Sequence, residues 1–147
     1  MKIYDYADLN GKRSWDYKDG NTPEDDRIRP IMITDKEINI GEPLIIDGTA
    51  YCVCCISAKK NEKQYACVEK LKEQEVFTKD VEPKERLYTN NVICPYCGYE
   101  NVDSWECEDD EEACECGCCG SIFAYQRKVA IEYCSQPVKK ANAICLN

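Results

Sequence analysis

No histidine occurs among the 147 residues of this chain. Histidine is the side chain best suited to general acid–base catalysis near neutral pH, and it is the commonest protein ligand of catalytic zinc. Hydrolytic zinc chemistry is therefore not expected. The acidic residues fall in runs such as Glu108–Glu112, which are typical of solvated turns, and the sequence has no glycine-rich phosphate loop. We assign no catalytic residue and expect a protein that is not an enzyme.

Long apolar runs are missing as well. No segment approaches the roughly 18 apolar residues of a membrane span, and the N-terminal residues lack the apolar stretch of a signal peptide. We therefore expect a soluble, intracellular protein with no membrane partner. The chain has only two Phe and two Met, so its aliphatic core must be thin. We expect a covalent or metal link to add to the stability that apolar burial supplies.

Cationic side chains are outnumbered. The chain has 19 Lys and Arg against 28 Asp and Glu, which gives a net charge of −9. A protein that binds nucleic acid needs a basic surface to displace counterions from the phosphates. Direct nucleic-acid binding is therefore not expected, and a protein partner with a basic surface is favoured.

Cysteine, in contrast, is abundant, with 13 residues. In a short chain this content indicates either a disulfide framework or metal ligation. Disulfides rarely persist in a reducing cytosol, and an odd number of cysteines leaves at least one thiol unpaired. For the expected intracellular protein, metal ligation is the better interpretation.

The cysteines of one segment have the spacing of a metal site. The sequences VICPYCG and ECGCCG each contain a C-x2-C pair, and 18 residues separate the two pairs. Gly98 and Gly120 each follow a pair and permit the positive φ that such a turn needs. Four thiolates suit tetrahedral Zn²⁺ and leave no open coordination position, which is the mark of a structural site. We predict one structural Zn²⁺, held by Cys94, Cys97, Cys116 and Cys119.

Other cysteines leave alternatives open. Cys114 and Cys118 crowd the second pair, and either is a possible replacement for one of its ligands. Cys107 and Cys134 are interpreted as core thiols, because cysteine usually behaves as a small buried hydrophobe. A second cluster in the N-terminal half consists of Cys52, Cys54, Cys55 and Cys67. It has neither the C-x2-C spacing twice nor a glycine after each pair, so core packing is favoured over a second metal site.

Two regions are expected, residues 1–90 and 91–147. Residues 1–30 are rich in turn formers, so we interpret them as a loop-rich start whose aromatic residues Tyr4, Tyr6, Trp15 and Tyr17 pack onto the rest. Short apolar runs then predict strands at residues 31–33, 38–40 and 44–46.

A β-hairpin is predicted next, from residues 50–57 and 64–71, with residues 58–63 as its loop. This hairpin would set Cys54 opposite Cys67. A helix over residues 64–74 is the alternative, because this segment contains Glu69, Lys70, Lys72 and Glu73, which are good helix formers with the spacing of helical ion pairs. Residues 78–91 are interpreted as a linker.

In the final region, side chains of different character alternate along the sequence, and this pattern predicts strands. A strand is expected on each side of the exposed acidic turn Glu108–Glu112, and a long last strand is expected over residues 121–134. The fold class is therefore all-β or β-rich, with antiparallel sheets and a C-terminal four-cysteine zinc ribbon.

The segments CPYCGYEN and DSWE, with C-x2-C-G before an aromatic-rich strand, resemble the zinc ribbon, or rubredoxin-like, family over about residues 92 to 138. Small zinc ribbon proteins of phages and prophages look similar. The resemblance implies knuckles at hairpin tips that pack on a three-stranded sheet. The size, the acidic charge and the missing active site also resemble anti-CRISPR proteins.

Three functions follow as hypotheses. The favoured one is a non-enzymatic, phage-derived inhibitor in the cytoplasm of a bacterial host cell, which binds a basic protein surface such as that of a CRISPR effector nuclease. The second is a DNA-binding ribbon that assists transcription, although residues 91–147 carry 4 basic and 10 acidic side chains. The third is a rubredoxin-like electron carrier with iron in the same four-cysteine site.

Overall fold

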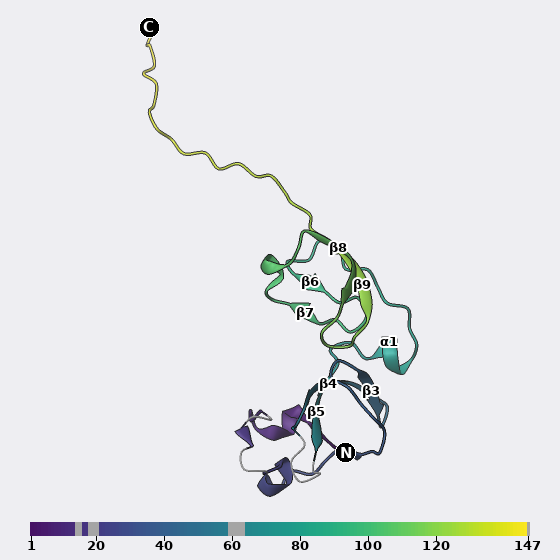
Figure 1. Ribbon diagram of the computed structural model, residues 1–147. Coiled ribbons are helices and arrows are strands. Elements are labelled where there is room, and N and C mark those ends of the chain that lie inside the picture. The colour runs from purple at the N-terminus through teal and green to yellow at the C-terminus, as the bar shows by residue number, and fades with distance from the viewer. Residues whose placement is uncertain (14–15, 18–20, 59–63, 147) are drawn as a thin grey trace.

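The computed structural model describes residues 1–13, 16–17, 21–58 and 64–146. Strands dominate it, which confirms the β-rich fold class (Figure 1). In chain order the elements are β1 (Lys2–Asp5), η1 (Tyr6–Leu9), η3 (Pro23–Asp26), β2 (Met32–Ile33), β3 (Pro43–Ile46), β4 (Thr49–Ile56), β5 (Tyr65–Lys70), α1 (Glu75–Thr78), β6 (Val92–Ile93), β7 (Glu100–Asn101), η4 (Ser104–Glu106), β8 (Asp110–Glu115) and β9 (Ile122–Gln126).

The first five strands form one sheet in the order β2-β1-β5-β4-β3. All neighbours pair antiparallel except β1 and β5, which run parallel. The expectation of a loop-rich start is wrong at β1, which lies inside the sheet. A four-residue strand carries too short an alternation to be recognised, and its partner is distant in sequence.

The packing expected of the N-terminal aromatic residues is found. Tyr4, Tyr6 and Tyr17 cluster with Tyr65 of β5, and the rings of Tyr4 and Tyr65 meet edge to face at 5.7 Å. Trp15 lies outside the described residues. The cluster therefore covers the β1–β5 part of the sheet.

The predicted strands at 31–33 and 44–46 are found as β2 and β3, but residues 38–40 form no strand. Instead, Ile38 packs in the core from a loop. The turn at residues 41–42 then makes two backbone hydrogen bonds with Val53 of β4. Gly41 N donates to Val53 O at 2.8 Å, and Val53 N donates to Glu42 O at 3.1 Å. An apolar run thus serves the core without becoming a regular strand.

The predicted hairpin is confirmed as β4 and β5, and the alternative helix over 64–74 is wrong. Its loop residues 59–63 lie outside the described residues. A β-bulge after Val53 shifts the register, so that Cys55 rather than Cys54 lies opposite Cys67. A bulge places two residues against one and turns the following side chains to the other face. The predicted Cys54–Cys67 pairing is therefore wrong by one residue.

Beyond α1, residues 79–91, which belong to the predicted linker, have no regular secondary structure. They lead into the two-hairpin region, defined here as residues 92–126, which contains the small antiparallel sheets β6–β7 and β8–β9. The division of the chain near residue 90 stays a prediction.

Two predictions for this region are wrong. The run Glu108–Glu112 is not a turn throughout, because β8 begins at Asp110. The last strand ends at Gln126, and residues 127–146 leave the body as an exposed, extended segment (Figure 1). Alternation alone predicts a strand, but a strand needs a partner for its backbone, and β8 ends its pairing with β9 at Gln126.

The five-stranded sheet is covered on both faces. On β4, Tyr51 and Val53 face one core, whereas Ala50 and Cys52 face the two-hairpin region. Alternate residues of a strand point to opposite faces. The sheet thus supplies one wall of the site described next. Within the described residues, no helix is long and apolar enough to cross a membrane.

Candidate metal centre

Two tight turns present the paired cysteines, and they are built alike. Knuckle 1 is residues 94–98 and knuckle 2 is residues 116–120. Cys94 N donates to Tyr99 O at 2.9 Å, and Gly98 N donates back to Cys94 O at 3.0 Å. Cys116 N and Gly120 N make the same two bonds in knuckle 2, both at 2.9 Å. The repeated pattern explains why the two sequence pairs share one spacing.

The glycine that ends each knuckle has the predicted positive φ, +77° for Gly98 and +73° for Gly120. A side chain in this left-handed region is strained. Space is also lacking, because a Cβ on Gly120 would lie 2.8 Å from the carbonyl oxygen of Gly41. Glycine is therefore required twice over at Gly120, for the turn and for the close approach of the neighbouring loop.

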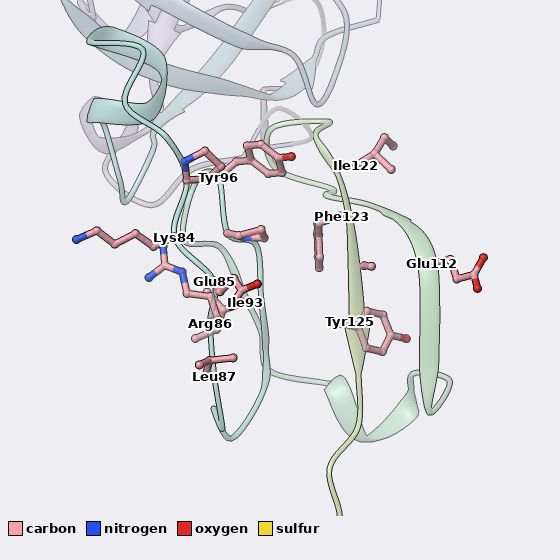
Figure 2. A pocket seen from close by; sticks show the side chains of 13 residues that line it. Lys84, Glu85, Arg86, Leu87, Ile93, Tyr96, Glu112, Ile122, Phe123 and Tyr125 are labelled. Atoms are coloured by element: carbon pink, nitrogen blue, oxygen red, sulfur yellow. The ribbon is translucent and has the colours of Figure 1, made fainter.

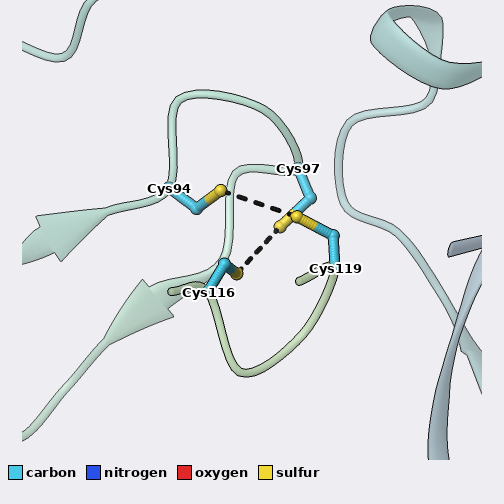
Figure 3. Close-up of side chains that lie close together, drawn as sticks. All are labelled: Cys94, Cys97, Cys116 and Cys119. Carbon is cyan, nitrogen blue, oxygen red and sulfur yellow. Dashed lines mark hydrogen bonds between the residues drawn. The ribbon is translucent and has the colours of Figure 1, made fainter. Parts of the chain in front are cut away.

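The two knuckles face each other and bring the four predicted cysteines together (Figure 3). Their ligand atoms all lie within 4.8 Å of one another, and all four residues are buried. Cys94 Sγ and Cys119 Sγ are 3.8 Å apart, and Cys97 Sγ and Cys116 Sγ are 3.7 Å apart. A tetrahedron with metal–sulfur bonds of about 2.3 Å has sulfur–sulfur edges of about 3.8 Å. These residues lie close enough to bind a metal ion.

The acidity of the thiols reflects their crowding. Hydrogen bonds from Cys94 and Cys97 lower the pKa of Cys119 to about 2. The hydrogen bond to Cys119 raises the pKa of Cys94, and the contacts with Cys118 and Cys119 raise the pKa of Cys97. A bound metal cation would favour the deprotonated form of these sulfurs, because metal ligands must lose their protons.

Further polar groups surround the site. Cys118 N points at Cys116 Sγ at 3.4 Å, and the Ser121 hydroxyl lies 3.1 Å from Cys119 Sγ. Such contacts orient ligands and stabilise their charge. We did not predict the role of Ser121 from the sequence, although a hydroxyl two residues after the last cysteine of a knuckle is a signal that was available.

The remaining cysteines are separated from the four-cysteine site or flank it. Cys114 is half-buried on β8, and Cys118 lies against Cys52 rather than replacing a ligand. Cys134 is exposed, so its prediction as a core thiol is wrong, and Cys107 is only partly buried. Among the described residues, Cys94, Cys97, Cys116 and Cys119 form the one group of three or more side chains close enough to share a metal ion. The described N-terminal cysteines therefore form no such group.

The site packs directly on the five-stranded sheet. Ala50 and Cys52 of β4, together with Leu71, share one buried cluster with the four cysteines. Glu73 N donates to Cys97 O at 3.0 Å, which ties knuckle 1 to the segment between β5 and α1. Knuckle 2 is held by the close approach of Gly41. The site is therefore in direct contact with the sheet through both knuckles.

A groove with a volume of about 590 Å³ runs beside knuckle 1, between the linker and β9 (Figure 2). Phe123 and Tyr125 form its β9 wall, and Tyr96 closes one end. Arg86 lines the linker side and pairs with Glu73. The lining mixes apolar and aromatic side chains with the charged residues Lys84, Glu85, Arg86 and Glu112.

Comparisons of the chain with family models, with curated proteins and with solved structures find no match. The functional interpretation therefore depends on the chain's own residues and their geometry.

Proposed function

We propose that the four-cysteine site holds one structural Zn²⁺ and that this ion closes a zinc ribbon formed by the two-hairpin region. The observation that carries the proposal is the pair of sulfur–sulfur distances, 3.7 and 3.8 Å, which fit tetrahedral zinc. The four sulfurs fill all positions of a tetrahedral ion. The ion would supply folding energy, because the ligands come from two turns that are 18 residues apart.

Elemental analysis of protein made in zinc-replete medium tests this proposal. We expect about one zinc per chain, and Cys94→Ser or Cys119→Ser should lose most of it. Cys134→Ser is the matched control, since Cys134 is exposed and outside the site. Less than half an equivalent of any metal in the parent would refute the site, whereas one equivalent of iron with visible absorbance would favour the electron carrier.

We further propose that the ribbon docks its acidic face on a basic protein surface. The acidic face is defined by the exposed carboxylates of the end of η4, of the turn that follows and of the start of β8: Glu106, Glu108, Asp109, Asp110, Glu111 and Glu112. Arg127 pairs with Asp109 at 2.9 Å. The other carboxylates of the acidic face are therefore available to form ion pairs with Lys or Arg side chains of a partner protein.

Trp105 supports a contact role for the same face. Its side chain is 73% exposed in η4, beside Glu106. Exposed tryptophans are costly to leave in water, and tryptophan is enriched among residues that dominate interface energies. An exposed aromatic side chain next to polar, charged residues is compatible with an interface that has an aromatic contact and a polar rim.

The partner class that this face fits best is a nucleic-acid-binding protein, whose channels are positively charged. The proposed consequence is inhibition, and the resemblance to anti-CRISPR proteins makes a CRISPR effector nuclease the partner to test first. The acidic face opposes direct DNA binding, because like charges meet there.

A binding and cleavage assay with purified effector nuclease tests the partner class. We expect micromolar or tighter binding and slower target cleavage by the parent, with Trp105→Ala at least tenfold weaker. Tyr133→Ala in the exposed tail is the control for loss of a surface aromatic residue. No binding and unchanged cleavage would refute the inhibitor function. Micromolar or tighter binding to DNA alone would favour the transcription ribbon.

A further inference from the structure

A second pair of thiols lies directly beside the four-cysteine site. Cys52 Sγ and Cys118 Sγ are 3.1 Å apart, closer than the opposed sulfurs within the site itself. Cys52 is on β4 and only 4% exposed, whereas Cys118 is half-buried within knuckle 2. The sequence interval between them is 66 residues. The pair therefore spans the contact between the five-stranded sheet and the two-hairpin region.

We propose that Cys52 and Cys118 form a reversible disulfide that ties knuckle 2 to the sheet. A disulfide has a sulfur–sulfur bond of about 2.05 Å, so the two sulfurs need to approach by about 1 Å. A change of that size is within the reach of side-chain rotation. The pair is a modification site distinct from the proposed zinc ligands, and it takes a low-molecular-weight disulfide such as oxidised glutathione as its oxidant.

The exposures of the two thiols set the order of the exchange. The Cys118 thiolate, which solvent reaches, attacks one sulfur of oxidised glutathione and releases one glutathione thiolate. The buried Cys52 thiolate then attacks the Cys118 sulfur of the mixed disulfide and releases the second glutathione. Two protein thiols are oxidised, oxidised glutathione is reduced to two thiols, and the two protein protons pass to the released glutathione thiolates.

Cys97 is the competing partner, because it belongs to the buried cluster against which Cys118 packs. A disulfide between Cys97 and Cys118 would remove a ligand from the four-cysteine site. With a metal bound, the Cys97 sulfur is engaged and Cys52 is the free thiol next to Cys118. The metal would thus direct oxidation to the Cys52–Cys118 pair and away from its own ligands.

The link would complete the attachment of the two-hairpin region. Knuckle 1 is already tied to the segment between β5 and α1 by the hydrogen bond from Glu73 N to Cys97 O. Knuckle 2 contacts the sheet side through the approach of Gly41 to Gly120. A covalent bond from β4 to Cys118 holds this second end and opposes its separation when the metal is lost.

Disulfide mapping of the full chain tests the proposal. Reduced protein is assayed for metal, incubated with oxidised glutathione, alkylated and digested without reductant for mass spectrometry. We expect one dominant cross-link, between Cys52 and Cys118, with the metal content unchanged. Cys52→Ala should leave glutathione attached to Cys118, Cys118→Ser should abolish the cross-link, and Cys134→Ser should preserve it.

Three results would overturn the proposal. They are a dominant Cys97–Cys118 link with metal loss, a dominant link among the four predicted ligands, or glutathione retained on Cys118 of the parent. Metal content is measured before oxidation, so a failure of the zinc site is recorded separately from the cross-link. As a second readout, oxidation should raise the unfolding temperature of the parent by roughly 5 °C or more. The Cys52→Ala variant, if folded by circular dichroism, should show no such rise.

Discussion

Gly120 combines two requirements at a single residue. It has φ +73° at the end of knuckle 2, and a Cβ there would lie 2.8 Å from Gly41 O. Gly48, in the turn between β3 and β4, has φ +77° but open space around its Cα. The two glycines therefore share the backbone requirement and differ in the contact.

We expect Gly120→Ala to destabilise the protein by about 1 kcal/mol for the left-handed backbone and by about 1–3 kcal/mol more for overpacking against the Gly41 carbonyl. Gly48→Ala should show only the first effect. Urea unfolding of both variants in excess zinc measures the difference. Equal losses in the two variants would show that the Gly41 contact carries no energetic weight.

Tyr4 is expected to make the protein sensitive to alkali. Its hydroxyl is buried with no hydrogen-bond partner among the described residues, and desolvation raises the pKa of Tyr4 to about 12. The folded-state pKa exceeds the ordinary value of about 10, so the folded state retains the proton longer than the unfolded state. The stability due to the neutral phenol is complete below pH about 10 and is lost as the pH rises through the folded-state pKa.

Tyr4→Phe should therefore lose less stability than the parent between pH about 10 and about 12, where the unfolded tyrosine is ionised and the folded one still holds its proton. At neutral pH it should be as stable as the parent or slightly more stable, because an unpaired buried hydroxyl is removed. Tyr133→Phe, in the exposed tail, is the control. Parallel stability curves for the two variants across this range would contradict the assignment.

Among the structural elements, the two hairpins depend on the four cysteines more than the sheet does. β6 and β7 are two residues each, and isolated two-stranded hairpins are marginally stable at best. The five-stranded sheet has its own core on the opposite face, around Val53 and Val68. Loss of a bound metal should therefore destabilise the two-hairpin region more than the five-stranded sheet.

Removal of the metal by a chelator should abolish amide protection in residues 92–126 while β1, β4 and β5 keep most of theirs. The ligands hold the hairpins together, and metal-binding energy in such sites is folding energy, on the order of 10 kcal/mol. Hydrogen exchange with mass spectrometry measures this, with and without added zinc. Uniform loss of protection over both regions would mean that sheet and hairpins form one cooperative unit.

The elements also show which sequence patterns were sufficient. The β4–β5 hairpin was predictable because both strands are long and a polar loop joins them. β1 was not, since its neighbour β5 is brought to it by parallel pairing over about 60 residues. The bulge after Val53 has no local signal in the sequence, and it alone decides whether Cys54 or Cys55 faces Cys67.

For the whole molecule, charge governs association with the proposed partner. The Debye length falls from about 14 Å at 0.05 M salt to a few Å at 0.5 M, so steering by the acidic face should fade. We expect the association rate with the effector nuclease to fall at least tenfold over this range. Stopped-flow binding measures the rate, and a salt-independent rate would argue against electrostatic steering.

A charge-matched pair of variants locates the effect. Glu108→Gln, Asp110→Asn and Glu112→Gln together should slow association as high salt does. Asp35→Asn, Glu37→Gln and Glu82→Gln remove the same charge from exposed positions outside the acidic face and should change the rate little. Equal slowing by both sets would indicate that net charge, not this face, drives association.

The sequence by itself determined the composition of the four-cysteine site and the shape of each knuckle, because two C-x2-C-G pairs specify local turns through short-range hydrogen bonds. Spacing favoured Cys116 and Cys119 but left Cys114 and Cys118 open as replacements, and the structure groups Cys116 and Cys119 with the first pair. Tertiary structure alone decided that the knuckles face each other and that β4 forms one wall. It also brought Cys52 within 3.1 Å of Cys118. Such contacts join residues far apart in the chain, and they depend on strand order and packing that local patterns do not encode.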